Sequence, residues 1–174
     1  MNEISMLMHL LSKKTSSYQI GATKKEILRA LNVKNKNKSI QFHSLIVNLS
    51  NYLEPLGLQI KFNPLNSCWF ISFDADISDA ISANPFEGKP KLAASLFCAL
   101  AVCLKNSGTG AVSEMEKLRN KKNVLEDLKD LERMGYIEFK KDIGSIKLTP
   151  LIGYQLDLEK LFFILALNKL KEDE

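Results

Sequence analysis

Few side chains in this 174-residue sequence are spaced for catalysis or for metal binding. His43 adjoins Ser44, but neighbours on a helix point in different directions, and no acid is placed to orient a serine–histidine pair. Asp74, Asp76 and Asp79 are spaced like the oxygen ligands of a calcium loop, yet the glycine and the later bidentate glutamate of such a loop are missing. We therefore predict no catalytic residue and no metal site, and we expect the protein not to be an enzyme.

The other candidates for chemistry are the cysteines and one glycine-rich stretch. Cys68, Cys98 and Cys103 each lie within an apolar run, which favours buried apolar filling over metal or redox work. The Gly-Thr-Gly stretch at 108–110 lacks the flanking strand and the lysine that a phosphate-binding loop requires. We accordingly expect no cofactor.

Positive charge is concentrated in the first half of the chain. Residues 1–72 hold nine lysines and arginines against three acids, whereas residues 73–174 hold fifteen against seventeen. A basic half could face nucleic acid, and it could equally consist of solvated lysines on a small domain. Lys34, Lys36 and Lys38 are candidates for contacts to backbone phosphates, with weak non-specific DNA binding as the expected result; a solvated turn is the alternative.

The composition is that of a folded globular protein, with 45% apolar and 25% charged residues. No apolar run reaches the roughly 18 residues that span a membrane, and the N-terminus does not resemble a signal peptide. We expect a cytoplasmic protein without a membrane partner.

An internal repeat predicts the architecture. The ten residues from Leu53 to Phe62 return at Leu131 to Lys140 with the same physical pattern. In each copy a helix ends on an apolar residue, a glycine takes the left-handed stop position, and a strand opens after it. A repeat of this length indicates two similar units in one chain.

The elements before and after each glycine follow the same order. In the first copy we expect three helices: one over 2–11, a short one that opens at a capping box at Thr23–Glu26, and one over 39–53. Strands are expected over 58–62 and 68–73. The apolar face of the third helix comprises Phe42, Leu45, Ile46, Leu49, Tyr52 and Leu53. In the second copy we expect a helix over 92–104, a capping box at Ser113–Glu116, a third helix with its apolar face between Val124 and Met134, and strands over 137–141 and 145–148.

These elements predict an α+β, mostly helical fold of two tandem winged-helix (helix-helix-helix-wing) domains plus a C-terminal apolar helix. The expected bounds are 1–74 for the first domain, 75–90 for the linker, 91–150 for the second domain and 151–174 for the extension helix. That last helix has too many apolar residues for one narrow stripe, so part of it is a candidate partner-binding surface. The leading candidates are Phe162, Phe163 and Leu167, and packing of this helix as core is the alternative.

The third helices are poorly suited to reading DNA bases. Base recognition favours Arg, Lys, Asn or Gln on the exposed face of the helix. The first offers amides, hydroxyls and one histidine but no lysine or arginine over 39–53. The second has four acids against Lys129 and Arg133, and phosphate repels an acidic helix.

Several motifs make the chain resemble the segregation and condensation protein B family. They are Leu53-Glu54-Pro55-Leu56-Gly57-Leu58, Lys91-Leu92-Ala93-Ala94, the stretch from Lys117 to Leu128, and Leu131-Glu132-Arg133-Met134-Gly135-Tyr136-Ile137. Two positions depart from the family pattern: its Gly-Arg-Pro turn is Lys141-Asp142-Ile143-Gly144-Ser145 here, and Asn120 stands where a glycine is expected.

The resemblance implies a homodimeric accessory subunit that binds the kleisin of an SMC complex in chromosome condensation and segregation, in the cytoplasm and associated with the nucleoid. ATP hydrolysis would then belong to the SMC partner. A winged-helix transcription regulator is the alternative, and an interaction domain of another complex is the third interpretation. Self-association is expected mainly from the first domain, with Ile4, Met6 and Leu10 as candidate contacts.

Overall fold

A computed structural model describes residues 2–33, 37–74, 85–106, 108–120, 124–140, 144–156 and 158. The described residues up to Asp74 form one compact unit, and those from 85 to 156 form a second. The fold class is α+β, as predicted, and helix outweighs strand in both units.

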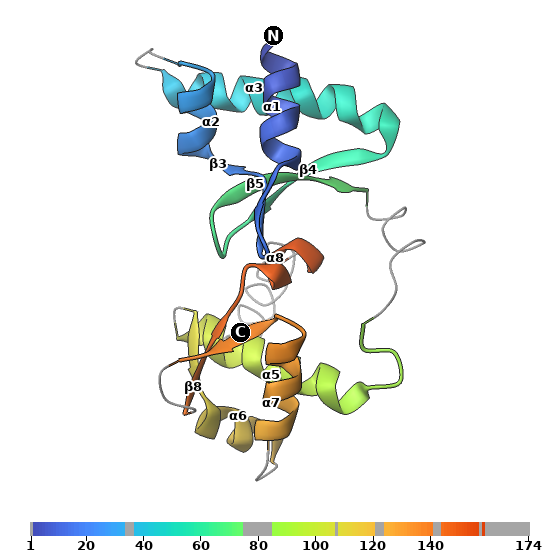
Figure 1. Cartoon of the computed structure of the whole chain (residues 1–174), viewed down its shortest axis with the longest axis vertical. Helices are drawn as coiled ribbons and strands as arrows, with labels where there is room; N and C mark the ends of the chain where they lie inside the picture. The colour runs from blue at the N-terminus through green and yellow to red at the C-terminus, as the bar shows by residue number, and fades with distance from the viewer. Residues whose placement is uncertain are drawn as a thin grey trace, which may run out of the picture. The chain divides into compact units, whose positions relative to one another are not determined.

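The first unit consists of three helices and a small sheet, with the helices gathered on one side of the sheet (Figure 1). Its elements in chain order are α1 (Glu3–Ser12), β1 (Lys14–Ser16), β2 (Gln19–Ile20), β3 (Ala22–Thr23), α2 (Lys24–Ala30), α3 (Lys38–Leu53), the 3-10 turn η1 (Glu54–Leu56), β4 (Leu58–Asn63) and β5 (Cys68–Phe73). The predicted helices and the two long strands are confirmed within one or two residues at each end.

Local sequence signals explain where these elements begin and end. Thr23 and Glu26 form the predicted capping box: the Glu26 N–H donates to Thr23 Oγ1 at 3.3 Å, and the Thr23 N–H donates to Glu26 Oε2 at 2.8 Å. Gly57 ends η1 at a φ of 67°, the left-handed conformation that was predicted from the repeat.

The apolar face of α3 builds the core of the first unit together with α1 and α2. The core side chains are Leu7, Leu11, Ala22, Ile27, Phe42, Leu45, Leu49 and Leu53. Tyr52 was predicted on this face but is 68% exposed, because α3 turns its ring away from the buried stripe.

Three strands form an antiparallel sheet in the order β3-β5-β4, and β1 pairs with β2 in a separate hairpin. Gly21 precedes β3 at a φ of 83°, and a Cβ built there would lie 2.0 Å from the carbonyl oxygen of Trp69. Only glycine therefore lets the chain enter the sheet at this point.

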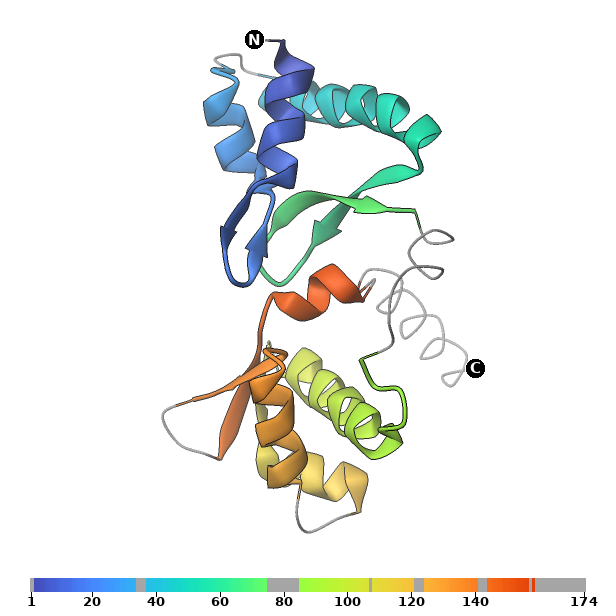
Figure 2. The same ribbon diagram turned by 45° about the vertical axis from the view of Figure 1, so that its right-hand side comes forward.

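Apart from the β1–β2 hairpin, the second unit repeats the order of helices and strands of the first and adds a short helix at its end. Its elements are α5 (Pro90–Lys105), β6 (Thr109–Ala111), α6 (Val112–Arg119), α7 (Leu125–Arg133), β7 (Ile137–Phe139), β8 (Ser145–Leu148) and α8 (Leu151–Gln155). The sheet order β6-β8-β7 corresponds to that of the first unit, and α5, α6 and α7 lie on one side of the β7–β8 hairpin (Figure 2). Gly135 ends the third helix of this unit at a φ of 81°, like Gly57 in the first.

The second predicted capping box is wrong. Ala111 is the N-cap of α6 and makes no side-chain cap hydrogen bond, so Ser113 lies inside the helix. The reason is that β6 runs directly into α6, which moves the helix start two residues earlier. The side chain of Glu114 instead accepts a hydrogen bond from Asn106 Nδ2 at 2.9 Å.

Short strands between the first two helices of each unit were not predicted. The sequence reading placed a loop over 106–110 where β6 begins, and it gave no strand at β3. Apart from the β1–β2 hairpin of the first unit, each unit is therefore helix-strand-helix-helix-strand-strand. Most of the predicted linker lies outside the described residues. So does the predicted apolar part of the C-terminal helix, apart from Leu158; the last helix that the structure describes is the short α8.

Candidate protein-binding and nucleic-acid interfaces

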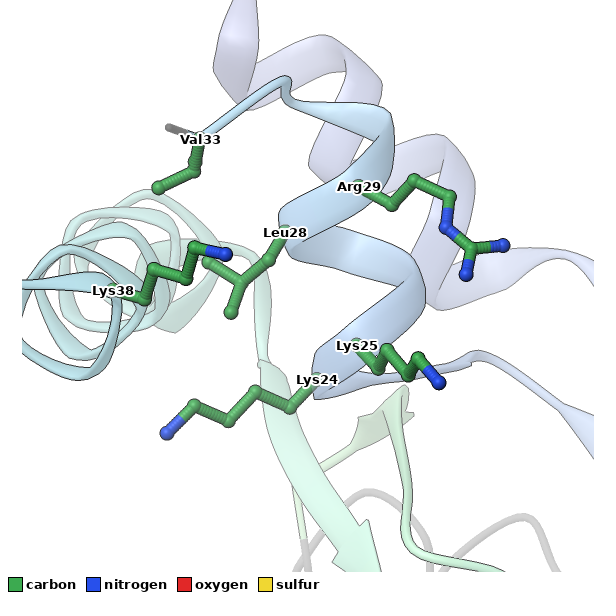
Figure 3. Close-up of a pocket in the computed structure, with 6 residues that line it drawn as sticks. All are labelled: Lys24, Lys25, Leu28, Arg29, Val33 and Lys38. Carbon is green, nitrogen blue, oxygen red and sulfur yellow. The ribbon is translucent and has the colours of Figure 1, made fainter. Parts of the chain in front are cut away.

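Helix α2 and the start of α3 bring together four cations around an open depression (Figure 3). We call this the basic surface; its cations are Lys24, Lys25, Arg29 and Lys38, and Leu28 and Val33 line the depression with them. Figure 3 shows Lys24 and Lys38 on either side of Leu28, whereas Lys25 and Arg29 project from the other side of α2. All four cationic side chains are exposed.

The orientation of Lys24 is fixed by two contacts. Its ammonium donates to Ser39 Oγ at 2.8 Å and lies 5.2 Å from the centre of the Phe42 ring, a cation–π distance. The acid on α2, Glu26, is occupied at the helix N-terminus: hydrogen bonds from the Thr23 backbone and then its side chain hold the pKa of this carboxyl below its ordinary value. The basic surface thus keeps a net positive charge.

The outward face of α3 carries no charge. From Ser39 to Leu53 the helix has no lysine, arginine, aspartate or glutamate. Ile40 is 70% exposed and Val47 is 41% exposed, one on each side of Ser44 on the same stripe. The exposed polar residues of the helix include His43, Ser44, Asn48 and Asn51; the last two also line an open depression with Asn2, Ile4 and Tyr52.

Helix α7, the corresponding third helix of the second unit, presents mainly acids. Several of its charges are occupied within the unit. Asp130 pairs with Arg133 at 2.9 Å, and Glu132 Oε1 accepts from the backbone N–H of Phe139 at 3.2 Å. A negatively charged helix whose side chains already form an ion pair and a hydrogen bond within the unit is poorly suited to contact phosphates or base edges.

A polar cluster ties the three helices of the second unit together. The hydroxyl of Ser95, which is fully buried on α5, donates to Asp127 Oδ2 on α7 at 2.7 Å. Arg119, the last residue of α6, lies 3.6 Å from the same carboxylate oxygen and donates to the carbonyl of Lys91 at 3.1 Å. Asn120 follows at a φ of 48°, and asparagine is one of the few residues other than glycine that tolerate the left-handed conformation.

Two of the three cysteines are buried, as the sequence predicted. Cys68 and Cys103 are fully buried, and Cys98 is half-buried. Burial raises the pKa of the Cys103 thiol to about 11, so the side chain stays neutral and unreactive near neutral pH. Among the described residues no group of three or more His, Cys, Asp or Glu side chains is arranged to hold a metal ion.

Of the predicted site residues, the structure describes only Lys38, which belongs to the basic surface. Lys34 and Lys36 lie outside the described residues, as do Phe162, Phe163 and Leu167. Sequence reasoning missed Lys24, Lys25 and Arg29, although a local count of charge would have found them.

The apolar residues of α1 that were candidates for self-association are largely used inside the unit. Ile4 and Leu10 are half-buried and pack against the core of the first unit. Met8, on the same helix, is 42% exposed and was not among the candidates. Within the described residues, no helix is long and apolar enough to cross a membrane.

No protein-family model and no curated protein matches this sequence. Among solved structures, the chain is similar to a conserved hypothetical protein from Chlorobium tepidum, with 14% identity and a TM-score of 0.39 over 86% of this chain and 93% of the other. It is also similar to ScpB from Mycobacterium tuberculosis, with 17% identity and a TM-score of 0.32 over 91% of this chain and 94% of the other. ScpB is the family that the sequence motifs resemble, and likenesses this distant carry no argument about function.

Proposed function

We propose that the two units are winged-helix domains in tandem, over 1–74 and 91–150 with 75–90 as linker, and that the chain is a non-enzymatic accessory subunit binding the kleisin of an SMC complex. Apart from the β1–β2 hairpin of the first unit, each unit has the order helix-strand-helix-helix-strand-strand, with the last of these strands in the middle of the three-stranded sheet. A helix-turn-helix followed by a two-stranded wing is the winged-helix order. The family motifs lie at equivalent places in this order, at the glycines that end the two third helices.

The neutral outward face of α3 is the feature that most supports a protein partner. This is the surface a winged helix would place in the major groove, and here it is uncharged and exposes Ile40 and Val47. Desolvating charged side chains is costly, so the centres of protein–protein interfaces are depleted of charge and accept such a neutral, partly apolar face. A kleisin segment with apolar anchors is therefore the partner we assign to it.

Three further parts of the proposal follow from the family resemblance. The chain acts as a homodimer, in the cytoplasm at the nucleoid, and ATP hydrolysis is left to the SMC partner. Phe162, Phe163 and Leu167 remain candidates for a second partner contact from the C-terminal segment. Replacing Phe163 by Ser separates the two roles of that segment: loss of the complex with an unchanged melting temperature supports a contact, and a collapse of the melting temperature supports core.

A winged-helix transcription regulator is the second candidate, because the basic surface adjoins the third helix of the first unit. A regulator must distinguish sequences, and the α3 face offers asparagine amides for that purpose but no arginine or lysine. Nanomolar, sequence-dependent binding at physiological salt would favour the regulator.

Co-purification from the native host tests the proposed function. We expect a tagged full-length chain to bring down SMC and kleisin subunits, identified by mass spectrometry, at stoichiometric rather than trace amounts. Recovery of RNA polymerase or of a single operator sequence without these subunits would contradict the proposal.

A further inference from the structure

The positive charge of the first unit is confined to one segment. From Thr23 to Lys38 the sequence has six lysines and arginines against one acid, whereas the rest of residues 1–72 has three lysines against two acids. Nearly all of the excess charge of this half of the chain therefore comes from sixteen residues. Fold stability does not require like charges to gather in one segment. Such a concentration instead indicates a surface that attracts negatively charged partners.

The structure shows how four of these cations are displayed. Lys24 and Lys38 face the gap between α2 and α3, and Lys25 and Arg29 project from the opposite side of α2 (Figure 3). Their charges are spread over both sides of α2 and the start of α3 rather than gathered at one point. A small anion is held by convergent donors, whereas long cationic side chains spread over a surface suit a polyanion whose charges are themselves spaced along a line.

We propose that the basic surface binds the phosphate backbone of duplex DNA without reading its sequence. The cations Lys24, Lys25, Arg29 and Lys38 contact phosphates, and the neutral face of α3 beside them stays available to a protein partner. The surface is thus a second binding site, separate from the proposed kleisin contact, and it stands or falls independently of that proposal.

Duplex DNA is favoured over an acidic protein segment because four of the six residues that line the depression are cations and its two apolar residues are only partly exposed. The apolar residues that line the depression, Leu28 and Val33, are both half-buried. The other lining residues are the four cations. Protein interfaces depend on a few large buried anchors, which this surface does not provide. Phosphate contacts need only charge and reach, which long lysine and arginine side chains supply.

The test measures binding of the full chain to a fluorescently labelled duplex of about 20 base pairs by anisotropy, from 50 to 200 mM salt. The variant K24Q/K25Q/R29Q/K38Q removes the basic surface. The matched control K105Q/K117Q/K129Q/K147Q removes the same net charge from exposed positions of the second unit. Because Lys24 also contacts Ser39 and Phe42, a second variant, K25Q/R29Q/K38Q, leaves that lysine in place, and circular dichroism checks the fold of all three.

We expect the wild-type affinity to fall with a log–log salt slope of about −3 to −4, since each phosphate contact contributes about −0.9. The quadruple variant should lose at least tenfold in affinity and most of that slope, the triple variant slightly less, and the control less than threefold. Two unrelated duplexes should bind within threefold of each other.

Three results would overturn the proposal. Equal losses in variant and control would mean that only the net charge of the chain matters. A hundredfold preference for one duplex would mean base readout rather than backbone contact. Binding of poly-L-glutamate as tight as that of DNA of equal charge would mean that the surface takes acidic protein segments instead.

Discussion

Removal of the Asp127 carboxylate should destabilise the second unit far more than removal of an acid three residues away. Asp127 accepts from the buried Ser95 hydroxyl at 2.7 Å and lies 3.6 Å from the Arg119 guanidinium. The side chains of this ion pair are only 19% and 17% exposed. In the Asp130–Arg133 pair on the same helix they are 54% and 77% exposed, which makes Asp130→Ala a matched control.

The magnitude follows from the burial of the three groups. Leaving a buried hydroxyl without its acceptor costs about 1–3 kcal/mol. Loss of the ion pair adds about 1 kcal/mol, well below the value for fully buried pairs, because both side chains keep some contact with water. We therefore expect Asp127→Ala to lower the free energy of unfolding by about 3 kcal/mol, and Asp130→Ala to lower it by less than about 0.5 kcal/mol.

Urea denaturation can follow each unit of the full chain separately. Trp69, the one tryptophan of the sequence, reports on the first unit by fluorescence, whereas far-ultraviolet circular dichroism reports on both units. With a denaturant slope of about 1 kcal/mol per molar urea for so small a unit, the second-unit midpoint should fall by about 3 M in Asp127→Ala. Asp127→Asn, which keeps an acceptor for Ser95, should fall between wild type and Asp127→Ala.

The reasoning is refuted if Asp127→Ala and Asp130→Ala have the same midpoint, because the cluster would then contribute nothing beyond an exposed pair. A shift of the Trp69 transition as large as that of the dichroism would also refute it, since the cluster lies wholly in the second unit.

Three more changes test individual steps of the account. Gly21→Ala should lower the first-unit midpoint by an amount corresponding to about 2–4 kcal/mol, because the new Cβ would lie 2.0 Å from the Trp69 carbonyl oxygen at a positive φ. Thr23→Ala should cost about 1 kcal/mol at pH 7. It should also weaken the acid sensitivity of the unit: the folded pKa of Glu26 lies below the ordinary 4.5, so its stabilisation is present above that pH and is lost as pH falls below it. Cys103 should resist iodoacetamide at pH 8 until urea unfolds the chain, because a pKa of about 11 leaves only ~0.1% thiolate.

Two of these tests, the glycine substitution and the thiol labelling, have an internal control. Gly88→Ala places a Cβ in open space at a similar positive φ, so it should cost only the backbone strain of about 1 kcal/mol. If both glycine variants are equally destabilised, the contact with Trp69 is not the cause. For the thiols, peptide mapping should find Cys98 alkylated first, since it alone is half-buried; early labelling of Cys103 would contradict its burial.

The helices were predictable because their signals are local. Phe42, Leu45 and Leu49 recur at helical spacing, and Thr23 with Glu26 forms a cap that needs no distant partner. The same cap pattern at Ser113 failed because β6 pairs with β8, a tertiary interaction that extends the backbone up to Ala111 and lets the helix start there.

The rest of the fold and site depends on neighbours far apart in sequence. The two-residue strand β3 shows no alternation of its own and exists because Ala22 pairs with Trp69. The basic surface likewise depends on the packing of α2 beside the start of α3, which places Lys24 near Lys38. Lys24 and Lys38 are 14 residues apart in the sequence, so the sequence predicted only the lysines just before α3.

Binding to the kleisin encoded by the same genome tests the central claim most directly. The full chain and the purified kleisin are mixed and followed by size-exclusion chromatography with light scattering and by titration calorimetry. We predict a stable complex that persists in high salt and is weakened at least tenfold by Ile40→Glu or Val47→Glu on the outward face of α3. Leu118→Glu, at an apolar position of the second unit whose exposure lies between those of Ile40 and Val47, should leave it unchanged. Absence of a complex with folded wild-type protein, or a complex lost through Leu118→Glu and indifferent to both α3 variants, would contradict the account.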